Sequence, residues 1–544
     1  MTSGKRVEIG NERATVRWEG EVGTTGSWLG VEWDREGRGK HDGVHQDVTY
    51  FSPVRPGNNC SFVRRTKVTS WGVGLIEAVR SRYGEVAGVT AGVDQKHMEE
   101  LQAEIGARFV EVVGFDKVNK EQSQIKKLKT ASVRCMGVVG RGESDVDLGS
   151  ELPALRDLDL SDSLVTNWSE LVSIINELKL HTIDLSGNLL DMDTWRGDTI
   201  APMDTLTHLV LGHMLYTGYT WSQVLTLATR MPSLSVLQVH HNHITSIPSF
   251  DTHQLANIRE IDLDGNNISD WSQVDPLSQL PLLQHLRLNG NKLSNINISA
   301  GTFCKLESLQ LIDNCIANWS DVGNLDQIGL TQLRFRNNPV ISSCKDEEIA
   351  RQMTIARITS LKFLNGTGIN QSERKWAEID YLKTFGQKWI EISKIENPEV
   401  KEKSLQDFLS QHNRYDTIVK MYGEPEPGDG AKVDTSIKAS LLRLKIRSPE
   451  IIGSAETVKK IPSSMNVRAL RALLTRLYKA QAGGNKLRIS LVSSRNNGDN
   501  KEQEVEIDND MRDISFYSVS DGDSLLVRWT DPDQISKPPI ITDL

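Results

Sequence analysis

The chain of 544 residues contains few cysteines, and their spacing excludes the common cysteine-based architectures. The five are scattered, at Cys60, Cys135, Cys304, Cys315 and Cys344. An odd number without any Cys-x-x-Cys pair favours neither a disulfide framework nor a zinc site. We interpret them as reduced thiols of a cytoplasmic protein, serving mostly as small buried apolar residues.

Long apolar runs and an excess of basic charge are also absent. No stretch reaches the roughly 18 apolar residues of a membrane-spanning helix. The first residues, MTSGKRVEIGNERATVRW, lack the apolar centre of a secretory signal peptide. The formal charge of −9 argues against a general nucleic-acid binder, whose binding surface is usually basic. The sequence therefore predicts neither a membrane nor a nucleic-acid partner.

Signals for catalysis are equally scarce. No Ser/His/Asp order, paired carboxylates or metal-ligand spacing stands out, and the glycines of 137–142 lack the Gly-Lys-Ser/Thr of a phosphate-binding loop. His240, His241 and His243 have no suitably spaced cysteine or carboxylate to complete a metal site. We therefore predict no enzyme, no cofactor and no metal.

What the chain does contain is one phrase repeated eight times, apolar-x-x-apolar-x-apolar. The copies are 23 to 28 residues apart by subtraction, starting at Leu155, Leu180, Leu206, Leu234, Ile258, Leu283, Leu306 and Leu330. A degenerate earlier copy starts at Leu128. This period and signature resemble the leucine-rich repeat family. Because one copy cannot bury its apolar edge alone, the resemblance implies a stacked solenoid whose alternating residues form strands.

Two polar features recur with the repeats. An asparagine that can bond the backbone at a turn follows most strands, at Asn188, Asn242, Asn266, Asn291, Asn314 and Asn338. A Trp-Ser pair with a helix-capping residue before it recurs at Trp168, Trp221, Trp271 and Trp319. We interpret both as structural, and we expect the tryptophans to pack between layers.

The polar positions of the repeat strands would form the concave face. They are acidic over most of its length and basic at its C-terminal end. A solvated sheet face is one interpretation; a charge-zoned docking surface for a partner protein is the other. The candidate residues are Asp157, Asp159, Asp184, Glu260, Asp262, Arg287, Arg334 and Arg336.

Residues 1–70 form a glycine-punctuated, β-rich module. The motifs Trp28-Leu-Gly-Val-Glu-Trp33, Gly39-Lys-His-Asp-Gly43, Tyr50-Phe51 and Ser61-Phe-Val63 resemble the CAP-Gly domain. His41 stands where the family most often has asparagine. The resemblance implies a small barrel that binds acidic C-terminal tails ending in Glu-Glu-Tyr or Glu-Glu-Phe, such as that of α-tubulin.

The residues predicted to bind such a tail divide into cations and an apolar slot. Lys40, Arg64, Arg65 and Lys67 can meet carboxylates, and Trp33, Phe51 and Phe62 can hold the terminal ring. We expect Trp18, Trp28 and Tyr50 to be core. The full candidate set is Trp33, Lys40, His41, Asp42, Phe51, Phe62, Arg64 and Arg65.

The rest of the chain is predicted as connectors, caps and one further module. A helix over 93–109 and a strand over 109–113 precede the repeats, and helices from 347 to about 422 follow them. Beyond a Pro/Gly-rich linker, two strands, an amphipathic helix (Leu470, Leu473, Leu474 and Leu477 on one face) and two further strands resemble the ubiquitin-like fold. No Gly-Gly terminus follows it, so we predict a built-in interaction domain.

The fold class is therefore multidomain: an all-β CAP-Gly barrel, an α/β leucine-rich repeat solenoid and an α+β ubiquitin-like domain. The predicted boundaries are CAP-Gly 1–70, connector 71–127, solenoid 128–340, helical cap 341–423, linker 424–436, ubiquitin-like domain 437–530 and tail 531–544.

This order of modules resembles the tubulin-folding cofactor E family. The resemblance implies a cytoplasmic, cytoskeleton-associated chaperone that captures α-tubulin and, with other folding cofactors, assembles or dissociates the αβ-tubulin dimer. Those cofactors include one that holds β-tubulin and one that promotes GTP hydrolysis. Two alternatives stay open: a microtubule plus-end adaptor, and an adaptor that reaches the proteasome or ubiquitin through the C-terminal module.

Overall fold

The structure is a computed structural model. It describes residues 3–23, 26–84, 124–142, 146–216, 218–425, 441–451, 456–479, 487–492, 504–508, 510, 513–517, 519 and 521–529. The chain forms two compact units, residues 1–321 with 327–342, and residues 322–326 with 343–544. The predicted helix over 93–109, the strand over 109–113 and the tail over 531–544 lie outside the described residues. In the described part of the chain, no helix is long and apolar enough to cross a membrane.

The N-terminal module is a twisted antiparallel sheet. Its order is β1 (Arg6–Ile9), β2 (Glu12–Glu21), β3 (Ser27–Trp33) and β6 (Cys60–Val63). A hairpin of β4 (Val44–His45) and β5 (Val48–Thr49) precedes β6, and the short helix η1 (Arg65–Lys67) follows it. Val7, Val16, Leu29 and Val31 form its core, with Trp33. Period-two alternation thus buries one face of the sheet and leaves the other for contacts.

A short connection joins this module to the solenoid. Strand β7 (Val73–Gly74) leads into α1 (Leu75–Tyr83) and pairs in parallel with β9 (Val138–Gly140). The helix buries Leu75, Ile76 and Val79. Helix η2 (Ile125–Lys127) then leads into the first repeat strand. Helix α1 contacts both β9 and η2, so it packs at the start of the repeats.

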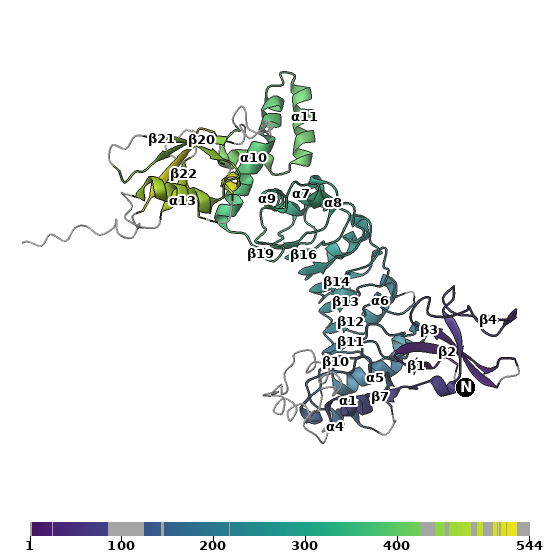
Figure 1. Cartoon of the computed structure of the whole chain (residues 1–544). Helices are drawn as coiled ribbons and strands as arrows, with labels where there is room; N and C mark the ends of the chain where they lie inside the picture. Colours follow the sequence, from purple (N-terminus) through teal and green to yellow (C-terminus); the bar gives the residue numbers. More distant parts are fainter. Residues whose placement is uncertain are drawn as a thin grey trace, which may run out of the picture. The chain divides into compact units, whose positions relative to one another are not determined.

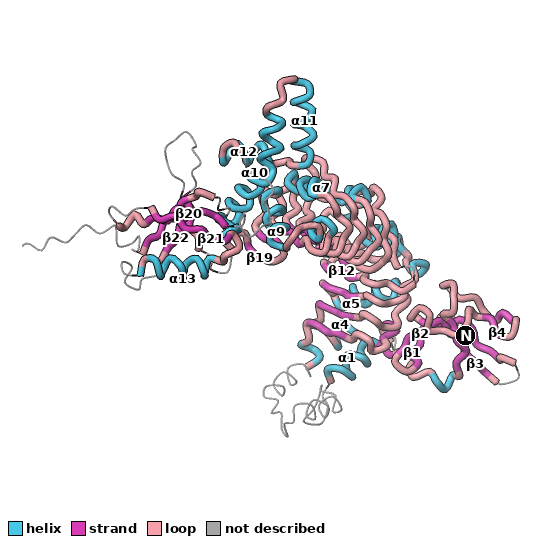
Figure 2. Tube along the Cα trace, turned by 45° about the horizontal axis from the view of Figure 1, so that its top comes forward, coloured by secondary structure: helices cyan, strands magenta, loops and turns pink. Residues whose placement is uncertain are grey.

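The predicted repeats are confirmed as a parallel ladder of short strands, which Figure 2 shows in magenta, stacked side by side. Each apolar centre pairs with the next, as Leu158 does with Ile183. The degenerate copy at Leu128 contributes a strand that pairs in parallel with β10. The strands are β8 (Thr130–Ser132), β10 (Asp157–Asp159), β11 (Thr182–Asp184), β12 (His208–Val210), β13 (Val236–Gln238), β14 (Glu260–Asp262), β15 (His285–Arg287), β16 (Ser308–Gln310) and β17 (Gln332–Arg334).

The recurring asparagines form a buried ladder along the solenoid. Asn266 shows the pattern: its Nδ2 donates to the carbonyls of Val239 and Leu263, and its Oδ1 accepts from the backbone N–H groups of Asn242 and Ile244. One amide therefore satisfies buried backbone groups in its own repeat and in the preceding one. This confirms the structural role predicted for these residues.

The other face of the solenoid carries short helices that begin at the Trp-Ser pairs. Thr220 and Asp270 form capping boxes with Gln223 and Gln273, and Trp168, Trp221 and Trp271 are buried. Trp319 is only partly buried. The helices are α4 (Leu148–Glu151), α5 (Trp168–Leu178), η3 (Met192–Thr194), η4 (Gly197–Thr199), α6 (Trp221–Ala228), η5 (Thr252–Leu255), η6 (Trp271–Gln273), η7 (Asp275–Gln279), α7 (Trp319–Asn324), η8 (Leu325–Gln327) and α8 (Pro339–Ser342).

The second unit contains the helical region that the sequence predicted as a cap, and we call it the helical cap. Helix α9 (Glu347–Arg357) packs on the long helix α10 (Gln371–Ser393), which also contacts α11 (Pro398–Gln411) and α12 (Tyr415–Tyr422). Between α9 and α10 lies a hairpin of β18 (Phe363–Leu364) and β19 (Thr367–Gly368). The core of the cap is aromatic, with Tyr381, Trp389, Phe408 and Tyr415 buried together. Figure 1 shows helices α10 and α11 of this cap lying next to each other and running in opposite directions.

The C-terminal module is a mixed sheet with one helix, the arrangement of a ubiquitin-like fold. Its order is β21 (Thr457–Pro462), β20 (Leu441–Arg447), β24 (Ser524–Arg528), β22 (Arg488–Val492) and β23 (Glu504–Glu506), and β20 and β24 are parallel. Helices α13 (Val467–Leu477) and η9 (Ile514–Tyr517) complete it. The sequence predicted four of these strands and missed β23. The predicted amphipathic helix is present; of the four leucines on its predicted face, Leu470 and Leu474 are buried, whereas Leu473 and Leu477 are exposed.

Candidate functional site: an aromatic surface on the N-terminal sheet

A β-bulge creates an aromatic surface on the outer face of the N-terminal sheet. Val16 pairs with Val31 in the core, whereas Trp18 pairs with Gly30, because the register shifts at Arg17. Without the extra residue, period two would place Trp18 on the same face as Val16. The bulge therefore turns Trp18 outward, onto the face where Phe62 of β6 also pairs with Gly30.

Phe62 is the centre of a group of partly or fully exposed rings. We call it the Phe62 cluster. The ring centroids lie 4.6 Å from Phe62 for His41, 5.2 Å for Tyr50, 5.8 Å for Trp18 and Phe51, and 6.1 Å for His45. Of the predicted site residues, His41, Phe51 and Phe62 meet here. Trp18 and Tyr50, expected in the core, lie at the surface instead, and neither they nor His45 were among the predicted site residues.

Trp33 lies elsewhere. Its side chain is 3% exposed in the core of the sheet, and its Nε1 donates to the Ser61 hydroxyl at 3.0 Å. It pairs with Ala14, which precedes the bulge in β2, and its side chain therefore points to the buried face of the sheet. The motif predicted that Trp33 forms part of the binding surface, but the strand register places its side chain in the core of the sheet. We therefore leave Trp33 out of the binding surface.

Two glycines are required for this surface. A Cβ at Gly30 would lie 2.2 Å from Cε1 of Phe51, which packs over the bare backbone. Gly43 has φ +97°, and a Cβ there would lie 2.0 Å from the carbonyl oxygen of Phe51. Both contacts are too short for any side chain, so the glycines allow the loop with Phe51 to close over the sheet.

His41 presents a hydrogen-bond donor to the cluster. Its Nδ1 accepts from the backbone N–H of Gly43 at 3.0 Å, which places the ring proton on Nε2. Among the described residues, that buried Nε2 has no partner. Burial, followed by the neighbouring His45, lowers the pKa of His41 and outweighs Asp42. The ring is therefore neutral at physiological pH, with one N–H unused.

The predicted charged residues are distributed unequally around the cluster. Lys40 and Asp42 are exposed, and the Lys40 backbone N–H donates to Cys60 O at 2.7 Å. Arg64 stacks on Trp28, with its Cζ 3.9 Å from the ring centroid. Trp28, which was expected in the core, is partly exposed. Arg65 is already engaged by Glu19 at 2.8 Å. Lys40 and Arg64 are therefore the cations best placed to meet an acidic ligand.

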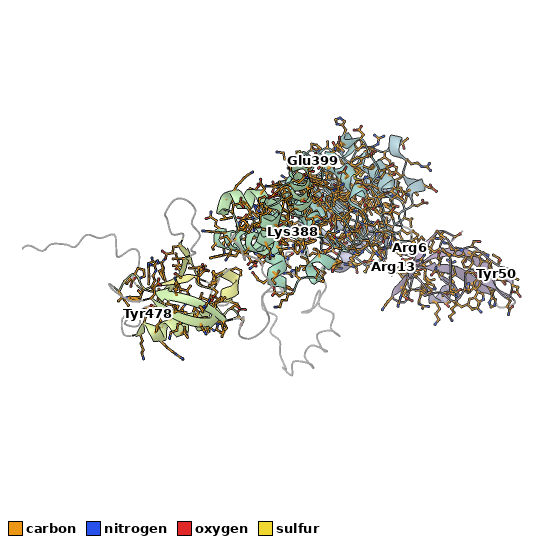
Figure 3. The ribbon with its side chains drawn as sticks, turned by 90° about the horizontal axis from the view of Figure 1, so that it is seen from above. Arg6, Arg13, Tyr50, Lys388, Glu399 and Tyr478 are labelled. Atoms are coloured by element: carbon orange, nitrogen blue, oxygen red, sulfur yellow. The ribbon has the colours of Figure 1, made fainter. Side chains whose placement is uncertain are left out.

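The same module docks on the solenoid through arginines. Arg13 bonds Asp162 at 2.7 Å, and Tyr216 lies beneath Arg55, whose Cζ is 4.4 Å from its ring centroid. The Tyr216 hydroxyl meets Thr15 Oγ1 at 3.2 Å and accepts from Arg17 at 3.4 Å. Figure 3 shows Arg6 and Arg13 at the end of the module next to the solenoid and Tyr50 at the opposite end.

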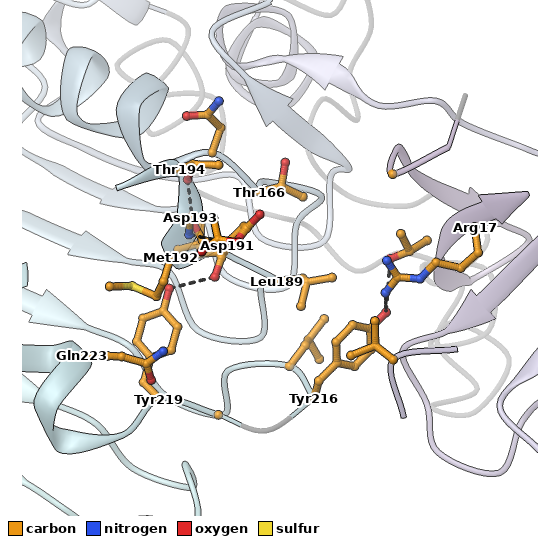
Figure 4. Close-up of a pocket in the computed structure, with 17 residues that line it drawn as sticks. Arg17, Thr166, Leu189, Asp191, Met192, Asp193, Thr194, Tyr216, Tyr219 and Gln223 are labelled. Carbon is orange, nitrogen blue, oxygen red and sulfur yellow. Dashed lines mark hydrogen bonds between the residues drawn. The ribbon is translucent and has the colours of Figure 1, made fainter. Parts of the chain in front are cut away.

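A cleft of about 650 Å³ opens at this junction. The N-terminal module contributes Thr15 and Arg17 of β2 and Val54 of the loop after β5, and the solenoid contributes its loops around Leu189 to Thr194 and Leu215 to Gln223. Figure 4 shows Arg17 and Tyr216 on one side and Asp191, Met192, Asp193 and Thr194 on the other. Nothing in the sequence pointed to this cleft, because its walls are separated by more than a hundred residues.

The predicted concave-face residues are only partly available. Asp262 is 3% exposed, and Arg287 bonds it at 3.3 Å and Asp264 at 2.8 Å. Burial alone would raise the pKa of Asp159, but hydrogen bonds from Ser161 and Ser132 outweigh it and lower that pKa. Asp157 and Asp184 accept from Thr130 and from the Ser186 N–H. Arg334 and Arg336 are exposed and make no ion pair among the described residues; Glu260 is half-buried.

Comparison with known proteins accounts for the whole chain. The CAP-Gly domain family matches residues 3–68. Tubulin-specific chaperone E of Bos taurus is 37% identical over 537 residues, covering 97% of this chain and 98% of the relative. The Drosophila melanogaster protein of the same name is 30% identical over 539 residues, covering 96% and 97%.

One solved structure matches the C-terminal module. The ubiquitin-like domain of mouse tubulin-specific chaperone E is 36% identical, with a TM-score of 0.15, and covers 19% of this chain and 97% of that chain. The multidomain fold class predicted from the sequence is confirmed, as is the family suggested by the order of the modules. The chain belongs to the tubulin-specific chaperone E family.

Proposed function

We propose that this chain is a tubulin-folding chaperone that captures α-tubulin by its acidic C-terminal tail. With other folding cofactors, including one that holds β-tubulin and one that promotes GTP hydrolysis, it would assemble or dissociate the tubulin dimer. Family membership supports the chaperone role. The proposal that the chain binds the acidic tail depends on the Phe62 cluster, a partly exposed aromatic surface near exposed Lys40 and near Arg64, which stacks on Trp28.

The chemistry of the cluster suits a peptide that ends in an aromatic residue after acidic ones. The rings around Phe62 meet mostly edge to face, so a further ring can join them in the same geometry. Lys40 and Arg64 would meet the acidic side chains, and the buried Nε2–H of His41 would donate to a carbonyl or carboxylate oxygen of the tail once the tail displaces the groups that cover this nitrogen. Lys40, which makes no ion pair among the described residues, and the His41 N–H would thus each receive a partner, whereas Arg64 would add a carboxylate to its contact with Trp28.

The solenoid would hold the body of the same client. Of its candidate residues, Arg334 and Arg336 keep exposed charge, whereas Asp262 and Arg287 are already paired. Two linked sites raise the effective concentration of the second contact, so each can be weak alone. We propose contact through the C-terminal end of the concave face, with Asp157, Asp184 and Glu260 setting orientation.

The test measures binding of a peptide ending in Glu-Glu-Tyr to the full chain. Phe62→Ala should weaken binding by about 30-fold or more, the size expected when a central aromatic anchor is lost. Phe363→Ala, which removes another half-exposed ring from the second unit, is the matched control and should leave binding unchanged. A peptide lacking the final tyrosine should bind the parent chain as weakly as the full peptide binds Phe62→Ala. Equal affinities throughout would refute the proposal for the tail.

A further inference from the structure

The cleft at the junction is not used by the proposed tail contact, yet two segments of the chain contribute residues both to the cleft and to the Phe62 cluster. Arg17 and Trp18 are consecutive residues, so their Cα atoms are about 3.8 Å apart. The bulge sends Trp18 to the cluster and leaves Arg17 in the wall of the cleft. A second link is the loop after β5, in which Phe51 joins the cluster and Val54 lines the cleft. Because Tyr50 of the cluster lies at the end of the module away from the solenoid, a client held at the cluster would reach the cleft with its body rather than with the residues next to its tail end.

The size and setting of the cleft fit a binding site. Its volume of about 650 Å³ falls within the roughly 300–1,000 Å³ that ligand sites occupy, and such sites favour junctions between domains. Its wall includes Val54, which is 60% exposed, together with the partly exposed side chains of Leu189, Met192 and Leu215. Aliphatic surface left open in a recess is available to an aliphatic side chain of a partner.

The charges in the cleft are unbalanced. Arg17 is engaged, since its Nε donates to the buried Glu32 carboxylate at 2.8 Å and its Nη2 donates to Tyr216. Across the cleft, Asp191 and Asp193 are exposed and make no ion pair among the described residues. Asp191 only caps η3, where its Oδ1 accepts from the Asp193 N–H at 2.9 Å. Two carboxylates beside an aliphatic wall thus lack a cation.

We propose that this cleft is a second subsite for the client and binds a segment that carries lysine or arginine next to an aliphatic residue. The inference rests on the proposed function, because it takes the client to be tubulin. It assigns opposite charge preferences to the two sites: the Phe62 cluster takes the acidic, aromatic end, and the cleft takes a cationic stretch of the client body. Such zoning would fix the direction in which the client lies across the junction.

The experiment compares two forms of tubulin, intact dimer and dimer whose acidic tails have been removed by limited proteolysis, binding to the full chain. The test variant is Asp191→Asn with Asp193→Asn, which removes both charges but leaves at residue 191 an amide oxygen that can take the place of the capping carboxylate oxygen of η3. The control is Asp204→Asn, an exposed aspartate of the same solenoid outside the cleft. Phe62→Ala reports on the tail site.

We expect the double variant to bind both forms of tubulin about 3- to 10-fold more weakly, with less dependence on salt, and the control to match the parent. Phe62→Ala should weaken binding of intact tubulin only. Unchanged binding of tail-less tubulin to the double variant would overturn the cleft assignment, as would an effect confined to intact tubulin. If instead Phe62→Ala has no effect while the double variant still weakens both forms, the tail proposal fails and the cleft stands.

Discussion

Two aromatic clusters in this chain have the same composition but opposite surroundings. In each, a histidine ring packs against a phenylalanine ring: the centroids are 4.6 Å apart for His41 and Phe62, which are stacked, and 4.5 Å apart for His412 and Phe408, which are tilted. The rings of the Phe62 cluster are partly open to solvent, and the buried Nε2 of His41 has no hydrogen-bond partner among the residues that the structure describes. In the helical cap, Phe408 is buried, and the His412 ring hydrogen-bonds the Tyr381 hydroxyl at 2.6 Å.

The two clusters differ in how many of their rings and hydrogen-bonding atoms have a partner within the chain. The cap cluster adds Trp389 and Tyr415, so its rings and polar atoms have partners and its role is to hold α10, α11 and α12 together. The Phe62 cluster has ring faces and an N–H left over. Unsatisfied groups in an open cluster are what a ligand can complete, whereas a closed cluster contributes only stability.

The largest expected effect is a difference in stability between the alanine variants of Phe408 and Phe62. Phe408→Ala should destabilise the helical cap by about 3–5 kcal/mol, because a fully buried ring is lost and a cavity remains. Phe62→Ala should cost only about 1 kcal/mol, since its ring is partly exposed. Hydrogen exchange of the α10–α12 amides and of β6 in the full chain measures both. A similar loss of protection in the two variants would show that the open cluster is structural after all.

Acid should distinguish the two histidines next. Burial, with Arg357 and Lys388 nearby, lowers the pKa of His412 to about 3, against about 6.5 in the unfolded chain. Because the folded pKa is the lower one, the unfolded state binds the proton first, and the cap loses stability as pH falls from about 6.5 towards 3.

The change can be followed by the fluorescence of Trp389, which packs in the same core. His412→Asn, which cannot titrate, should be less stable at neutral pH but should show a flatter pH profile over this range. A wild-type cap whose denaturant midpoint stays constant between pH 6.5 and 4 would contradict the argument.

How far the sequence predicted these clusters depends on the kind of signal. The repeats, the asparagine ladder and the capped Trp-Ser helices follow fixed periods, and the sequence located them to within a few residues. The CAP-Gly motif identified His41, Phe51 and Phe62, which the structure brings together. Period and motif are properties of a stretch of chain, so a single sequence reveals them.

Trp18 and Trp33 show what the sequence could not reveal. One extra residue at Arg17 inverts the face of everything after it in β2, and nothing in the local composition marks that position as a bulge. The pairing of Arg287 with Asp262 and Asp264 was equally hidden, since it joins neighbouring repeats. Both depend on register between strands, which a single sequence does not state.

A smaller effect tests the bulge itself. Trp18→Ala should weaken binding of a peptide ending in Glu-Glu-Tyr by about 10-fold, with little loss of stability, because one partly exposed wall of the cluster is removed. Trp33→Ala should do the reverse, destabilising the N-terminal module by about 3–5 kcal/mol through loss of a core ring. Fluorescence anisotropy for binding and hydrogen exchange of β2 and β3 measure the pair. If Trp33→Ala folds normally yet fails to bind, the original assignment of Trp33 to the binding surface would be right.

The smallest effect concerns charge at the rim of the open cluster. Arg65→Gln should change affinity for the acidic peptide by less than about 2-fold, because its guanidinium already meets Glu19 at 2.8 Å and exposed pairs contribute about 0–1 kcal/mol. Lys40→Gln, the matched control, should weaken binding about 3- to 10-fold, since exposed Lys40 makes no ion pair among the described residues. Titrations at low and moderate salt separate the two, because only the Lys40 contribution should fall as salt rises. An Arg65 effect as large as that of Lys40 would mean that the ligand displaces Glu19 and that the rim, like the rings, is left open for binding.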